Sequence, residues 1–152
     1  MIPTSIAVVS YRASIAKLIE DAKPALAMTL AFNRKTSPAD AVRKTRLLHA
    51  MLDRAALGTN WHKRADERSS YIAVIEHLDT NLHVHLAMTC GDKHLACVDA
   101  AATTAWRKLV PGGSVVIKPA HDVAGWGRYL SKEITPQTSD NLFLSEAASR
   151  PT

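Results

Sequence analysis

Two runs of β-forming residues, 71–78 and 82–88, are separated in this sequence only by Asp79-Thr80-Asn81. So short a polar connection joins neighbouring antiparallel strands, because parallel strands need a crossover of about a dozen residues or more. The two runs therefore predict a β-hairpin, and a chain that contains it must build its core around that hairpin.

The second strand of this hairpin has two different faces. Side chains alternate along a strand, so His83 and His85 project from one face. The opposite face is apolar and should face the core; it carries Leu82, Val84, Leu86 and Met88. Paired imidazoles at this spacing suit a divalent cation, although a structural role is the ordinary one for histidine.

Helices and further strands are expected on both sides of the hairpin. Residues 5–22 have helical apolar spacing that Pro24 ends, and the apolar run 25–32 predicts a buried strand. Ser37 supplies an N-cap before Pro38 and Asp40, and Gly58 is placed to end the helix that follows. The remaining expected segments are an exposed loop at 61–68, a helix at 92–109, a strand at 114–118, a helix at 123–134 and a loose tail from about 135.

From residue 25 onward the expected order is strand, helix, strand, strand, helix, strand, helix. This order predicts an α+β fold of the split βαβ kind, similar to ferredoxin and RNA-recognition domains. Helices would cover one face of an antiparallel sheet and leave the other face open for a site. We expect an N-terminal helical extension at 1–24, the main domain at 25–134 and a flexible tail at 135–152.

Composition narrows the function classes. The chain has 152 residues and a formal net charge of +5, which favours a polyanionic partner. Only Cys90 and Cys97 are present, too few for a disulfide scaffold, so a reducing cytoplasm is expected. No segment approaches the ~20 apolar residues of a membrane span. The sequence also lacks the glycine-rich phosphate loop of ATP-driven motors.

A second motif, Tyr129-Leu130-Ser131-Lys132, follows the histidines by one helix and one strand. Tyr129 and Lys132 are three residues apart and share a helical face. Neither motif is specific alone. Their order and their expected element types give the combination its weight.

With these two motifs, residues 25–133 resemble the HUH endonucleases, a family of rolling-circle replication initiators, relaxases and single-tyrosine transposases. The run from Met28 to Asn33 is loosely similar to the first-strand motif of that family. The resemblance implies that His83 and His85 bind Mg²⁺ or Mn²⁺. It also implies that Tyr129 cleaves single-stranded DNA to form a 5′-phosphotyrosine, assisted by Lys132.

The same resemblance implies a replication initiator, with a transposase as the alternative role. Single-stranded DNA from an origin or hairpin would be the substrate, and a separate host helicase would supply strand separation.

The third metal ligand depends on the hairpin register. With a two-residue loop at Thr80-Asn81, position 76 pairs with position 85 and Glu76 shares the histidine face. With a three-residue loop, position 77 pairs with position 83 and His77 takes its place. We favour Glu76, because two-residue loops are the commonest and an anionic oxygen suits Mg²⁺ or Mn²⁺ better.

Cations and exposed polar groups suggest DNA contacts. The expected contact residues are Asn33, Arg34, Trp61, Lys63, Arg64 and Arg128. Trp61 could stack on a base while the cations meet phosphates; a solvated connector is the alternative for 61–68. Arg43, Lys44 and Arg46 indicate a solvated helix face, with a DNA contact as the lesser alternative.

Two rival interpretations remain. A non-catalytic single-strand-binding module could use the same sheet, but it would present stacking aromatic rings rather than histidines on the open face. A structural zinc site could combine His85, Cys90, His94 and Cys97, although their spacing matches none of the usual zinc patterns.

Overall fold

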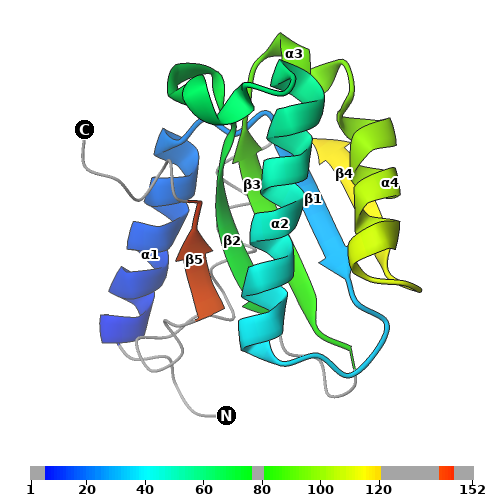
Figure 1. Cartoon of the computed structure of the whole chain (residues 1–152). Helices are drawn as coiled ribbons and strands as arrows, with labels where there is room; N and C mark the ends of the chain where they lie inside the picture. The colour runs from blue at the N-terminus through cyan, green and yellow to red at the C-terminus, as the bar shows by residue number, and fades with distance from the viewer. Residues whose placement is uncertain (1–5, 77–80, 121–140, 146–152) are drawn as a thin grey trace.

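The computed structural model, which describes residues 6–76, 81–120 and 141–145, is shown in Figure 1. The protein is α+β, with a five-stranded antiparallel sheet and, within these residues, four α-helices. In chain order the elements are α1 (Ile6–Asp21), β1 (Leu26–Ala31), α2 (Pro38–Leu57), the 3-10 turns η1 (Trp61–Lys63) and η2 (Ala65–Glu67), β2 (Ser70–Glu76), β3 (His83–Thr89), α3 (Asp92–Leu95), α4 (Val98–Leu109), β4 (Ser114–Pro119) and β5 (Leu142–Leu144).

The strands lie side by side in the order β4-β1-β3-β2-β5. The expected hairpin is confirmed as the antiparallel pair β2–β3. β3, the strand that carries the histidines, lies between β1 and β2 and is therefore the central strand of the sheet. The expected core face of β3 is also confirmed, since Leu82, Val84, Leu86 and Met88 are all buried.

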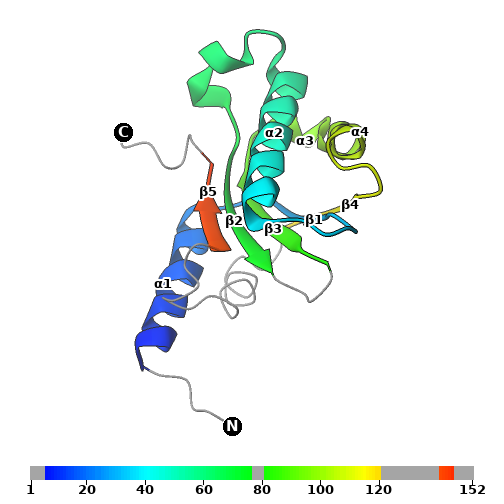
Figure 2. The same ribbon diagram turned by 60° about the horizontal axis from the view of Figure 1, so that its bottom comes forward.

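α2 and α4 cover one face of this sheet (Figures 1 and 2). α2 begins as expected, with the Ser37 hydroxyl accepting a hydrogen bond from the amide of Asp40 at 3.1 Å, and it ends at Gly58, whose φ is 88°. Trp106 anchors α4 to the sheet, because its indole N–H donates to the carbonyl of Ala31 at 3.1 Å. The main core fills the space between these helices and the sheet.

α1 packs on the opposite face, where the histidines also lie. Ile15 and Ile19 are buried there against Ile72, Val74 and Ala87. The expectation that this face is open is therefore only partly right: α1 covers the β2 side of it. The cause is the burial of the apolar stripe of α1, which the chain places against the nearest uncovered apolar strand residues.

The helix expected at 92–109 is wrong as one continuous element. It is divided into α3 and α4 at Ala96 and Cys97, and Leu95, expected on the buried face, is 42% exposed. His94 is buried instead, because its ring bonds the carboxylate of Asp53. This contact holds α3 against α2.

The expectation of a loose tail from about residue 135 is wrong for Leu142–Leu144. These residues form β5, which pairs with β2. Ser145 continues the contact: its amide donates to the carbonyl of Tyr71 at 3.1 Å, and its hydroxyl accepts from the amide of Tyr71 at 3.0 Å. The helix expected at 123–134 lies outside the described residues.

Within the described part of the chain, no helix combines the length and apolarity that a membrane crossing requires.

Candidate functional site

Three neighbouring strands bring the candidate ligands together on the face that α1 partly covers. His83 pairs with Glu76 on β2 and with Ala31 on β1. His85, one row further along, pairs with Thr29 on β1. Directly paired residues share a face, so Glu76, His83, His85 and Thr29 all project from the same side of the sheet.

Glu76 and Thr29 hold the ring of His85 from its two ends. The Glu76 carboxylate lies 2.7 Å from Nε2, and the Thr29 hydroxyl lies 3.2 Å from Nδ1. A carboxylate only accepts, so Nε2 carries the proton in this contact, and in a neutral ring Nδ1 then accepts from the Thr29 hydroxyl. These contacts fix the orientation and the tautomer of His85.

His83 stands differently. Its ring is stacked on that of His85, with centroids 6.4 Å apart and an interplanar angle of 18°. Its Nδ1 atom is buried and has no hydrogen-bond partner among the residues that the structure describes. A buried polar nitrogen without a partner carries a desolvation cost of about 1–3 kcal/mol, so Nδ1 of His83 is a candidate ligand atom.

The register of the hairpin corrects one expectation. Position 76 pairs with position 83 and not with position 85, a shift of two residues from the register that we expected. Six residues, an even number, separate Glu76 from His83. The strand period is two residues, so this shift leaves Glu76 on the histidine face. His77 lies outside the described residues.

The chemistry of this donor set fits a divalent cation. Two imidazoles and one carboxylate face the same side, and one imidazole nitrogen has no partner among the described residues. In the described part of the chain, however, no group of three His, Cys, Asp or Glu side chains is disposed to hold a metal ion as it stands. Nε2 of His85 and the carboxylate of Glu76 are in direct contact. Metal binding at these residues therefore requires that contact to open.

The other expected site residues divide into three groups. Tyr129, Lys132 and Arg128 lie outside the described residues. Asn33 lies near the histidine end of the sheet, where its amide nitrogen Nδ2 donates to the carbonyl of Gly112 at 3.0 Å. Arg34 follows it and is exposed.

Trp61, Lys63 and Arg64 precede Ser70, the first residue of β2. Ser70 is six residues from Glu76 at the other end of this strand, a separation of about 20 Å along the strand. Arg64 is engaged in structure, since Nη1 donates to the carbonyl of Leu57 at 2.8 Å and the guanidinium pairs with Glu67. The Trp61 ring is covered by the guanidinium of Arg68, 4.8 Å from its centroid. The structure thus does not bring these three residues to the histidines.

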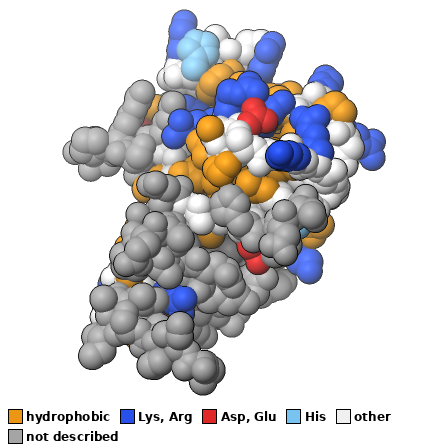
Figure 3. All heavy atoms as spheres, turned by 90° about the horizontal axis from the view of Figure 1, so that it is seen from below, with side chains coloured by type: hydrophobic (Ala, Val, Ile, Leu, Met, Phe, Trp, Pro, Cys, Tyr) orange, Lys and Arg blue, Asp and Glu red, His pale blue; other side chains and the backbone are white. Residues whose placement is uncertain are grey.

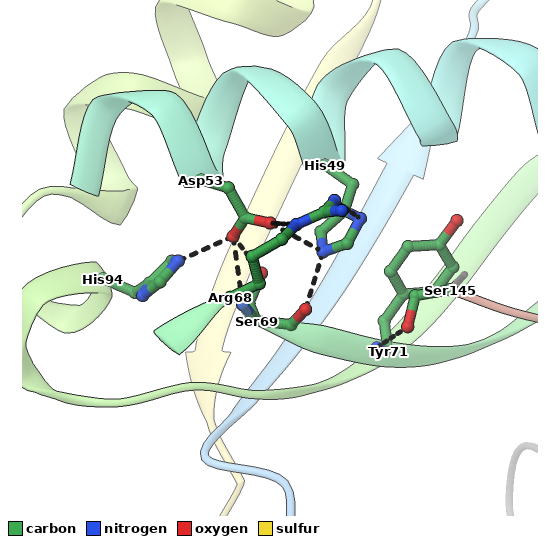
Figure 4. A network of polar contacts seen from close by, with 7 residues as sticks. All are labelled: His49, Asp53, Arg68, Ser69, Tyr71, His94 and Ser145. Atoms are coloured by element: carbon green, nitrogen blue, oxygen red, sulfur yellow. Dashed lines mark hydrogen bonds and ion pairs between the residues drawn. The ribbon is translucent and has the colours of Figure 1, made fainter. Parts of the chain in front are cut away.

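A second polar cluster, not foreseen from the sequence, lies at this other end of the sheet (Figure 4). Asp53, on α2, is fully buried and collects contacts from three segments. It accepts hydrogen bonds from Nε of Arg68 and Nε2 of His94, each at 2.7 Å, and from the amide and hydroxyl of Ser69 at 3.1 and 2.7 Å. His49 was expected to be a surface or packing residue, and it is buried one turn earlier on α2.

Electrostatics define the protonation states of this cluster. Burial alone raises the pKa of Asp53, but the hydrogen bond from Ser69, the electrostatic attraction of the His49 ring and the bonds from Arg68 and His94 together hold it below its ordinary 3.8. Burial lowers the pKa of His49 below 6.5, against the attraction of Asp53. A neutral His49 fits its partners, because Nε2 donates to the carbonyl of Ser69 at 2.9 Å.

The rival zinc site is not assembled. His94 is bound to Asp53, and His85 projects from the histidine face of the sheet. Cys90 packs against the main core on the other side, where burial first and then the charges of Asp53 and Cys97 raise its pKa to about 11. Among the residues that the structure describes, no group of three or more His, Cys, Asp or Glu side chains is placed to hold a metal ion, so these four residues do not form a zinc site.

No protein family, curated protein or solved structure matches this chain.

Proposed function

We propose that this protein is a metal-dependent endonuclease of the HUH type that cleaves single-stranded DNA and becomes covalently attached to it. The observation that carries the proposal is the convergence of Glu76, His83 and His85 on one sheet face, with a buried imidazole nitrogen of His83 lacking a partner in the described residues. The chain's net charge of +5 supports a nucleic-acid substrate.

The arrangement of elements supports the finer fold assignment, a split βαβ domain. The four strands β1 to β4 lie in the order β4-β1-β3-β2, with α2 between β1 and β2 and with α3 and α4 between β3 and β4. β3, which carries the histidines, is central in this order. The site is therefore held by rigid paired strands rather than by loops, as a precisely positioned reaction needs.

In the proposed reaction, the phenolate oxygen of Tyr129 forms a bond to phosphorus while the bond from phosphorus to the 3′ oxygen breaks. The departing 3′ oxygen takes a proton and becomes a free hydroxyl, and the 5′ phosphate stays on the tyrosine. A divalent cation held by Glu76, His83 and His85 would neutralise charge on the phosphodiester. Thr29 keeps the His85 ring oriented, and Lys132 would supply a positive charge to the phenol or the phosphate.

The role in the cell that we propose is initiation of rolling-circle replication, with a separate helicase to open the duplex. A single-tyrosine transposase would use the same residues. Rejoining needs no ATP in either role, because the phosphotyrosine keeps the energy of the cleaved bond.

A covalent-adduct assay tests the proposal. The protein is incubated with short single-stranded oligonucleotides and Mn²⁺, and adducts are separated on a denaturing gel. We expect an adduct for the wild type and for the control Tyr11→Phe, and none for Tyr129→Phe. An adduct at wild-type yield in Tyr129→Phe would show a different nucleophile. Absence of wild-type adduct on every strand, with and without metal, would refute the proposal.

The metal ligands are tested by titration calorimetry with Mn²⁺. We expect Glu76→Ala and His83→Ala to lower the affinity at least tenfold, and His77→Ala to stay near the wild-type value. A large loss in His77→Ala with normal binding by Glu76→Ala would reverse the assignment of the third ligand.

A second candidate function rests on the Glu76–His85–Thr29 series of contacts. A carboxylate that orients an imidazole beside a hydroxyl is also the arrangement of a metal-independent hydrolase, in which the hydroxyl proton of Thr29 passes to Nδ1 as Oγ1 attacks an acyl carbon. Ester hydrolysis that persists in EDTA and disappears in Thr29→Val would favour it.

The rival single-strand-binding module has less support. In the described strands, Tyr71 and Phe143 pack in the main core, on the helix side of the sheet. None of the described strand residues on the histidine face is Phe, Tyr or Trp. The stacking platform that such a module needs is therefore not present in these strands.

A further inference from the structure

A group of cations gathers on the helical layer, at the end of the sheet where β1 finishes. Figure 3 views the molecule from this end and shows Lys and Arg side chains over the helices. We name it the helical basic surface; its members are Arg34, Lys35, Arg43, Lys44, Arg46, Arg107 and Lys108. The segments that carry it, 33–46 and 106–113, contain a single acidic residue, Asp40.

Tertiary contacts make this surface continuous, although its members lie far apart in the sequence. Nζ of Lys44 on α2 donates to the carbonyl of Leu109 at 2.7 Å, which places the C-terminal end of α4 beside the N-terminal half of α2. The bond from Asn33 to Gly112 holds the β1–α2 loop against the segment after α4. A rigid scaffold therefore presents these charges, and they act together on a polyanion.

The composition of the surface indicates which kind of nucleic acid it fits. Single-stranded nucleic acid is held by exposed aromatic rings on which bases stack. The aromatic side chains in these segments and next to them, Trp106 and Phe32, are buried. A surface of cations without rings can recognise phosphates but not unstacked bases, which favours a duplex backbone.

The position of the surface connects it with the histidine site. Ala31, at the end of β1, pairs with His83, and Asn33 lies only two residues beyond it. The two sites thus share one end of the sheet, on its opposite faces. A DNA that occupies both sites therefore passes around this end of the sheet.

We propose that the helical basic surface binds the phosphate backbone of duplex DNA that flanks the single-stranded segment entering the histidine site. This inference rests on the proposed function, which supplies the single-stranded substrate. It assigns to Arg43, Arg46, Arg107 and Lys108 a role that the reaction itself does not need: holding a duplex next to the cleavage point.

Fluorescence anisotropy tests the proposal with three labelled DNAs: a duplex with a single-stranded tail, the same duplex without the tail, and the tail alone. The variant is Arg43→Gln/Arg46→Gln/Arg107→Gln/Lys108→Gln, whose four side chains are all exposed. Lys44 is kept, because it satisfies a helix carbonyl. The matched control is Lys23→Gln, an exposed lysine before the start of β1, at the opposite end of the sheet.

We expect the variant to bind both duplex DNAs at least tenfold more weakly at low salt, and the slope of log K against log salt to fall by about 0.9 for each lost phosphate contact. Binding of the tail alone should change less than twofold, and Lys23→Gln should match the wild type. Unchanged duplex binding, or an equal loss for duplex and tail, would overturn the proposal. The two proposals can fail separately. If the variant loses duplex binding but the wild-type protein never forms a DNA adduct, the surface is established as a duplex-binding site and the proposed endonuclease is refuted.

Discussion

Replacing Asp53 by asparagine should lower the free energy of unfolding strongly, although the two side chains have nearly the same shape. In Asp53→Asn the side chain keeps its size, but one acceptor oxygen becomes an NH₂ donor and the negative charge is lost. The guanidinium of Arg68, whose side chain is 17% exposed, then loses its ion-pair partner at 2.7 Å. The ring of His94 and the hydroxyl of Ser69 both bond Oδ1, so the remaining amide cannot satisfy all the former donors.

Removing one partner of a buried ion pair costs about 3–5 kcal/mol, and the partial exposure of Arg68 places this case near about 3 kcal/mol. For a domain of this length the melting temperature should fall by about 6–12 °C. Urea unfolding followed by circular dichroism measures the change, with the exposed carboxylate of Asp66 replaced in a matched control, Asp66→Asn, that should shift stability by less than about 0.5 kcal/mol. A loss below about 1 kcal/mol in Asp53→Asn would refute the reasoning.

Two further predictions concern stability. The pKa of His49 is lowered in the folded protein, so the unfolded chain binds a proton near pH 6.5 that the folded protein does not bind. The pKa of Asp53 is also lowered, so the stabilisation by its carboxylate is present above pH 3.8 and is lost as the pH falls through the folded pKa. The free energy of unfolding should therefore fall as the pH drops below about 6.5, and His49→Gln should flatten the first part of this fall; a wild-type stability that is constant from pH 7 to 5 would contradict it. Gly113→Ala should cost about 1–3 kcal/mol, because an added Cβ would lie 2.7 Å from Nε1 of Trp106 and 2.9 Å from the carbonyl oxygen of Ala31. The control Gly91→Ala meets nothing within 4 Å, so equal melting temperatures for the two variants would show that the clash is relieved.

Much of the fold could be predicted from local pattern. The alternation around His83 and His85 is a strand signal that does not depend on distant residues, and it identified the core face of β3. The Ser37 cap and Gly58 defined α2 for the same reason. The prediction that the hairpin connection has an even number of residues placed Glu76 on the histidine face. Its partner in the structure is nevertheless His83, two residues from the expected position 85.

What could not be predicted depends on partners that are distant in the sequence. β5 is only three residues long and is held by pairing with β2, so its sequence alone carries too little periodic signal. The break between α3 and α4 comes just after His94, whose ring bonds Asp53, 41 residues earlier. The Asp53 cluster was missed because its members come from three segments, which are α2, residues 68–69 and α3. The nearest sequence signal was the spacing of His49 and Asp53 by one helical turn.

β5 also determines how this sheet ends. Without these three residues, β2 would be the outermost strand over its whole length, and the alternate backbone amides and carbonyls that it now directs at β5 would face outward. A flat, apolar strand edge of this kind recruits strands from other chains. β5 therefore acts as a cap against self-association, and a fragment that ends before residue 141 should form oligomers that the full chain does not form.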